Sequence, residues 1–181
     1  MLGIPARITA GQHPAARAPR PGVRLGAAAA RYLDALHNAA EHIAGPDAVA
    51  TLDRSADRLL RGLTGESAWP TLRGHLLLLA AAGADPVTEL FIAAATRDLM
   101  SAHDHAAVLD SRIQDVNEVA GGGPLQWLPG IPHRLAADPH SGLYVNARSH
   151  LVADLADQIR TNAAVKHRPG QPSPMLRCRP S

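Results

Sequence analysis

The chain has 181 residues, which is enough for one domain with tails. Hydrophobic residues make up 46% of it but aromatic residues only 3%, so a core must come mainly from leucine and alanine on closely packed helices. A single cysteine excludes a disulfide framework, and no apolar run is long enough for a signal peptide or a membrane span. These features predict a soluble, cytoplasmic protein with no membrane partner.

Charge is distributed unevenly along the chain, although the formal net charge is only +2. Residues 1–24 and 166–181 contain basic side chains and no acid, whereas residues 25–165 contain ten basic residues and sixteen acids, a net charge of −6. The basic residues of the two ends are Arg7, Arg17, Arg20, Arg24, Lys166, Arg168, Arg177 and Arg179. Proline and glycine are frequent there, so both ends are predicted to be disordered arms that flank an acidic helical domain.

Between the arms, apolar residues recur every three or four positions and are interrupted by Gly-Pro and Asp-Pro pairs, which is typical of amphipathic helices joined by short turns. The predicted helices begin near Gly26, Pro46, Ser67, Pro86, Asp104 and Ser141. The third is apolar around more than half its circumference, from Leu76 to Leu79, and is the predicted buried central helix. Strand patterns are nearly absent. The expected fold is an all-α bundle of five or six helices.

Helical spacing also predicts which side chains face the core and which residues cap the helices. Ser67 and Asp104 are predicted N-caps. The predicted inward residues are Val87, Leu90, Phe91 and Ala94 in the fourth helix, Leu109 and Ile113 in the fifth, and Tyr144, Ala147, Leu151, Leu155 and Ile159 in the last.

Residues 124–132, PLQWLPGIP, form a proline-rich apolar stretch, here called the strap, that follows a GGG sequence. Two interpretations are open. In one, Trp127 and Leu128 anchor a partner, as apolar residues do at the centre of protein interfaces. In the other, the strap lies across the bundle and buries its large side chains, each contributing about 1.5–3 kcal/mol. We favour burial of Leu125, Trp127, Leu128 and Ile131, because the rest of the core is poor in aromatic residues.

No motif predicts catalysis. His37 and Glu41 share a helix face, and His103 and His105 flank a predicted N-cap, so a metal-dependent enzyme built on these four residues is one alternative. However, His42 lies five residues from His37 and falls on another face, which favours a simple surface pair of His37 and Glu41. The GGGP sequence lacks the lysine of a phosphate loop, and no serine lies in a nucleophile elbow. We therefore expect no catalytic, metal or cofactor-binding residues.

The eight basic residues of the arms are the predicted nucleic-acid contacts, because flexible cationic segments bind phosphates without reading sequence. The acidic middle of the chain would repel DNA, and few aromatic residues are available to stack on bases. The alternative, in which the arms only keep the protein soluble, stays open.

Four segments in one order carry a resemblance to a known family. They are AAEHIAGPDAVATLDRSADRLLRGLT (39–64), ESAWPTLRGHLLLLAAAGADPVTEL (66–90), HDHAAVLDSRI (103–113) and PLQWLPGIPHRLAADPHSGLYVNARSHLVADLADQIR (124–160). Together they resemble the accessory region beyond the helicase part of large actinobacterial conjugative relaxases of the MobF or TrwC type. The resemblance covers about residues 25–161 and neither arm.

The relaxase and helicase motifs of that family are absent: there is no histidine triad, no pair of nucleophilic tyrosines and no G-K-[ST] sequence. Accordingly, no catalytic role transfers to Tyr32 or Tyr144. The resemblance implies a detached helical module, or a gene remnant, that contacts protein or DNA beside the conjugation machinery without chemistry of its own.

Overall fold

The computed structural model describes residues 20–96, 99, 102–116 and 122–166. Within these residues the chain forms α-helices, one 3-10 turn and no strand, which confirms the all-α prediction. The elements are α1 (Pro21–Ala44), α2 (Pro46–Leu59), η1 (Leu63–Gly65), α3 (Trp69–Ala82), α4 (Pro86–Ala95), α5 (His105–Val116), α6 (His133–Ala136) and α7 (Gly142–Lys166). No helix in the described ranges is long and apolar enough to cross a membrane.

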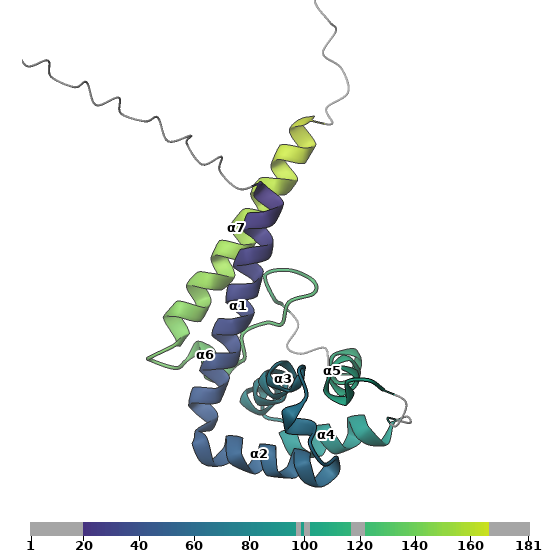
Figure 1. Cartoon of the computed structure of the whole chain (residues 1–181). Helices are drawn as coiled ribbons and strands as arrows, with labels where there is room; N and C mark the ends of the chain where they lie inside the picture. The colour runs from purple at the N-terminus through teal and green to yellow at the C-terminus, as the bar shows by residue number, and fades with distance from the viewer. Residues whose placement is uncertain (1–19, 97–98, 100–101, 117–121, 167–181) are drawn as a thin grey trace, which may run out of the picture.

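The molecule has two parts, which we call the stalk and the head (Figure 1). The stalk is the antiparallel pair of long helices, α1 and α7, and the last turns of α7 extend past the start of α1. The head consists of α2, η1, α3, α4 and α5, gathered around the far end of α1. Because α1 packs both on α7 and on α3, it joins the two parts.

The helix boundaries follow from local chemistry. Proline occupies the first turn of each helix from α1 to α4, where its missing N–H group leaves no hydrogen bond unmade. Gly83 ends α3 with a φ of 108°, a left-handed conformation that favours glycine. At the next turn, the carboxylate of Asp85 accepts a hydrogen bond from the backbone N–H of Thr88 at 3.2 Å and so caps α4.

Asp104 caps α5 as predicted, but Ser67 does not cap α3. The Asp104 carboxylate accepts a hydrogen bond from the backbone N–H of Ala107 at 2.9 Å, and its second oxygen accepts one from the Ser67 hydroxyl at 2.7 Å. These bonds hold the starts of α3 and α5 together, and the Ser67 hydrogen bond is the main cause of the lowered pKa of Asp104. Ser67 thus donates to Asp104, the residue that caps α5. The N-cap position of α3 is occupied by Ala68, which has no side-chain cap hydrogen bond.

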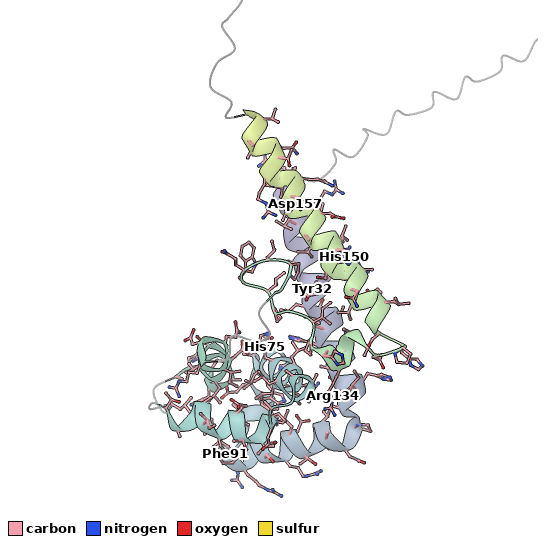
Figure 2. All side chains as sticks on the ribbon, turned by 180° about the vertical axis from the view of Figure 1, so that it is seen from behind. Tyr32, His75, Phe91, Arg134, His150 and Asp157 are labelled. Atoms are coloured by element: carbon pink, nitrogen blue, oxygen red, sulfur yellow. The ribbon has the colours of Figure 1, made fainter. Side chains whose placement is uncertain are left out.

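The buried face of α3 confirms its prediction as the central helix: Leu76, Leu77, Leu78 and Leu79 are all buried. Leu109 and Ile113 of α5 are buried as predicted. In α4, Leu90 and Ala93 face inward, but Phe91 is 45% exposed, so its predicted burial was wrong (Figure 2).

The predicted buried face of α7 is only partly correct: Leu155 is buried as predicted, but Ala147 is exposed, and the first half of the face is shifted by about one residue. Tyr144 and Leu151 are exposed, whereas Val145 and Val152 are fully buried. Both faces contain apolar residues at helical spacing, so the sequence alone does not choose between them. Helix α7 packs extensively on α1, whose buried residues include several alanines, and small side chains allow helices to pack closely.

The strap is only partly buried. Leu125 is buried and Leu128 and Ile131 pack partly against the core, but Trp127 is 72% exposed, so the prediction that it belongs to the core was wrong. The reason is a tight turn, in which the backbone N–H of Leu128 donates to the carbonyl of Leu125 at 3.0 Å and Trp127 lies outside. A Cβ atom on Gly123 would lie 2.0 Å from the Leu128 carbonyl oxygen, so this close approach requires glycine.

Alanine substitutions at Trp127 and Leu125, the exposed and the buried side chain of the strap, are expected to have different effects on stability. Trp127→Ala should change the free energy of unfolding by less than about 0.5 kcal/mol, because the side chain is in solvent. Leu125→Ala should lower it by about 2 kcal/mol, because it empties a buried site. Chemical denaturation followed by circular dichroism measures both. Equal losses for the two variants would show that Trp127 is covered in solution.

Candidate functional site

The residues of the metal-site alternative do not come together in one site. Glu41 accepts from the guanidinium of Arg73 at 3.3 Å rather than pairing with His37. His103 is exposed, and the Nδ1 atom of His105 lies 2.6 Å from a carboxylate oxygen of Glu66. Among the described residues, no group of three or more histidine, cysteine, aspartate or glutamate side chains is placed to hold a metal ion.

His37 instead belongs to a polar cluster between α1, α3 and α5. Its ring meets that of His75 edge to face, with centroids 4.9 Å apart and planes at 84°. The Nδ1 atom of His75 lies 2.5 Å from Asp110, whose other oxygen accepts from the amide of Gln114 at 2.7 Å. His75 is buried where these helices meet, within the head (Figure 2), and Gln114 is exposed at the surface.

Burial dominates the chemistry of His37. Its Nε2 atom is buried and has no hydrogen-bond partner among the described protein atoms. Burial, reinforced by the charge that His75 can carry, lowers the pKa of His37 to about 4. A Cβ atom on Gly74 would lie 2.5 Å from the His37 ring, so the ring rests directly on the backbone of α3. The cluster therefore fixes α1 to the head.

A groove lies between α1 and the start of α7. Its volume is about 620 Å³. Ala35 and Ala39 of α1 contribute its small side chains, and α1 also supplies Arg31, Asp34, Asn38 and His42. The opposite wall consists of His140, Ser141, Tyr144 and Arg148. This groove is polar along its rims, where side chains from both stalk helices meet.

The turn into α7 is held by Asp138, which gives the groove a fixed wall. The Asp138 carboxylate accepts from the backbone N–H of Ser141 at 2.7 Å and from its hydroxyl at 2.6 Å. Hydrogen bonding to Ser141 lowers the pKa of Asp138, so this capping carboxylate stays ionised under ordinary conditions. Across the groove, the rings of His42 and His140 have centroids 6.1 Å apart.

Tyr144 and Arg148 form a stacked pair on the α7 wall. They are four residues apart, so they share a helix face. The guanidinium of Arg148 lies 4.8 Å from the centroid of the Tyr144 ring and donates a hydrogen bond to the Tyr144 hydroxyl at 2.8 Å. Tyr144 is 52% exposed, so the pair presents flat, cationic and aromatic surface to solvent.

From the groove, a row of arginines runs along α1 toward the tip of the stalk. Arg24 and Arg31 are seven residues apart and Arg20 precedes Arg24 by four, so all three lie on the same edge of α1. All three are exposed, and none forms an ion pair with an acid of the described residues. With Arg148 on the facing edge of α7, they form what we call the cationic seam.

The acids that make the middle of the chain negative lie mostly in the head. Described residues from 45 to 116 include five arginines and nine acids, whereas α1, α6, α7 and their flanking residues include seven basic residues and five acids. On α7, Asp157 (Figure 2) pairs with Arg160. The stalk and the head therefore differ in the sign of their charge.

The structure places part of the predicted nucleic-acid contacts. Arg24 lies exposed in the first turn of α1 and Arg20 lies exposed directly before it. Helix α1 begins at Pro21 and α7 ends at Lys166, so positions 21–24 and 166, which the sequence analysis assigned to disordered arms, are helical. Arg7, Arg17, Arg168, Arg177 and Arg179 lie outside the described residues.

Sequence reasoning missed Arg31, Arg148 and the two groove histidines. Two signals could have indicated them: the seven-residue interval from Arg24 to Arg31 and the four-residue interval from Tyr144 to Arg148. No family model, curated protein or solved structure matches the chain.

Proposed function

We propose that this chain is a non-catalytic module that contacts nucleic acid through the cationic seam of its stalk. The observation that supports this most directly is the row formed by Arg20, Arg24 and Arg31, exposed and without acidic partners on one edge of α1. Unpaired arginines at helical spacing suit a repeating phosphate backbone, because each neutralised phosphate releases condensed counterions.

The two basic sequence segments support the same proposal. In the sequence, residues 1–19 precede α1 and residues 167–181 follow α7; the start of α1 and the end of α7 both lie in the part of the stalk away from the head, and the end of α7 lies further out (Figure 1). These two segments contain five further basic residues and no acid. The repulsive acids are concentrated in the head, at the other end of α1.

The resemblance to accessory regions of conjugative relaxase-helicases agrees with a nucleic-acid ligand, because those proteins act on plasmid DNA. The proposal includes this setting: a module beside a DNA-processing machine, without a reaction of its own.

Fluorescence anisotropy with short DNA across 50–200 mM salt tests the proposal on the full chain. Binding should weaken steeply with salt, and the double variant Arg24→Gln/Arg31→Gln should reduce the slope of log affinity against log salt by about two, since each phosphate contact contributes about 0.9. The matched control is Arg54→Gln/Arg58→Gln, which removes two exposed arginines from α2 in the head. No binding, or equal effects of the two double variants, would overturn the proposal.

Trp127 favours a second candidate function, contact with a protein. A tryptophan that is 72% exposed beside the partly buried Leu128 has the character of an interface anchor. On this proposal, a partner found by other means should lose affinity for Trp127→Ala while the variant keeps its stability. A variant that still binds fully would remove Trp127 from the interface.

A further inference from the structure

We infer that the groove between α1 and α7 is a binding site for one nucleotide unit, a flat base carrying a phosphate. This goes beyond contact with a strand along the seam, because it assigns the ligand of a cavity that the proposed function does not need. The groove shares Arg31 and Arg148 with the cationic seam, so a test must distinguish nucleotide binding in the groove from strand binding along the seam.

The base is assigned to the Tyr144 wall. The guanidinium of Arg148 lies over one face of the half-exposed Tyr144 ring, 4.8 Å from its centroid, so the pair offers a guanidinium plane and the other ring face for stacking. Unpaired bases stack on tyrosine rings and on arginine planes, and this stacking is tolerant of base identity. The alanines at positions 35 and 39 leave the space beside this surface open.

The phosphate is assigned to the end of the groove nearer the stalk tip. Because α7 runs antiparallel to α1, Arg148 lies toward the Arg31 end, and His140 lies toward the His42 end. Arg31 has no acidic partner among the described residues, and a guanidinium can bind two phosphate oxygens at once.

Asp34, the one carboxylate that lines the groove, indicates which part of the nucleotide lies beside it. Asp34 lies within a turn of Arg31 on α1, so a phosphate placed over it would be repelled. Its oxygens accept hydrogen bonds only, and Asn38 adds an amide one turn further on. Together they suit the edge of a base that has an exocyclic amino group, such as adenine.

The dimensions fit a single nucleotide. Arg31 and His42 are eleven residues apart, so the α1 side of the groove is about 16 Å long. The volume of about 620 Å³ lies within the roughly 300–1,000 Å³ typical of small-ligand sites. A base inside a duplex is covered by its neighbours on both faces, so only a free nucleotide or an unpaired one can bring its ring to Tyr144.

Isothermal titration calorimetry of the full chain with adenosine monophosphate, adenosine and inorganic phosphate tests the inference. The monophosphate should bind at least tenfold more tightly than either part alone. Tyr144→Leu should weaken it about tenfold, because base stacking on an aromatic ring is lost, whereas Tyr144→Phe should retain most of the affinity. His150→Gln, an exposed change on α7 outside the groove, is the control and should bind as the parent does.

Two outcomes overturn the inference: a monophosphate that binds no better than phosphate, or an affinity that Tyr144→Leu leaves unchanged. If DNA still binds in a manner that depends on Arg24, the proposed function survives that result. Conversely, monophosphate binding without DNA binding would support the nucleotide site in the groove and would contradict nucleic-acid contact through the seam. Competition by a single-stranded oligonucleotide then identifies the source of the nucleotide: displacement indicates an unpaired strand, and no displacement indicates a free nucleotide.

Discussion

Tyr32→Ala is expected to lower the free energy of unfolding by about 4 kcal/mol, as for other large aromatic residues truncated in a core. Tyr32 is wholly inaccessible in the middle of the stalk, and its hydroxyl donates to the backbone carbonyl of Pro129 at 2.8 Å (Figure 2). The substitution empties a large site between α1 and the strap and leaves that carbonyl without its donor. Urea unfolding of the full chain, followed by circular dichroism, measures the loss.

Tyr32→Phe separates the two contributions. It keeps the ring and removes only the hydroxyl, so the loss should be about 1 kcal/mol. Burial raises the pKa of Tyr32 to about 12, against a weaker opposing effect of Ser149, so the hydroxyl remains a donor throughout the physiological range. If the phenylalanine variant were as unstable as the alanine variant, the hydrogen bond to the strap, rather than the ring, would be the main source of stability.

Acidification is expected to destabilise the protein through His37. The pKa of His37 is about 4 in the folded chain and 6.5 as the ordinary value, so the unfolded chain binds the proton more readily. The stability that the folded chain has with His37 neutral is therefore fully present above about pH 6.5. It is lost progressively as the pH falls to about 4, because the unfolded chain takes up the proton first. A shift of this size corresponds to at most about 3 kcal/mol. Urea midpoints measured from pH 8 to pH 4 test this.

His37→Leu provides the matched variant, because it fills similar space without a titrating group. Its stability at pH 7 should be retained, since the substitution also removes the buried Nε2 atom that has no partner. Between pH 6.5 and 4 its midpoints should fall less than those of the parent chain. Asp85, Asp104 and Asp138, whose pKa values are lowered by hydrogen bonds, act in a separate window below pH 3.8. Parallel profiles for the two chains between pH 6.5 and 4 would contradict the assignment to His37.

Local sequence signals predicted the helices well because the signals and the structure depend on the same nearby residues. Asp85 with Pro86 starts α4 and Gly83 ends α3, and each acts within one turn of its own position. The predicted buried character of α3 was also correct, because an apolar surface on most sides of a helix leaves no alternative.

The predictions failed where two surfaces of one segment were equally plausible. In α7 the stripe containing Tyr144 and the stripe containing Val145 are both apolar, and contact with α1 decides between them. The prediction that Trp127 is buried was wrong for a different reason: the turn that exposes this side chain depends on a backbone contact at Gly123.

The candidate site could not be predicted because its walls lie far apart in the sequence. Arg31 and Arg148 meet only because the first and last helices pair. The same holds for His37, His75 and Asp110, which three separate helices contribute. Sequence intervals indicate which residues share an edge of one helix, but they do not indicate which helices lie side by side.

The pairing of α1 with α7 also has a kinetic consequence. The helices of the head follow one another closely along the chain, so their contacts close short loops, whereas α1 and α7 are separated by the whole of the head. Closing that long loop costs more chain entropy, which delays its formation until neighbouring contacts exist. Part of α1 is already held by α3 once the head has formed, so we expect the docking of α7 to be the last step of folding and its release the first step of unfolding.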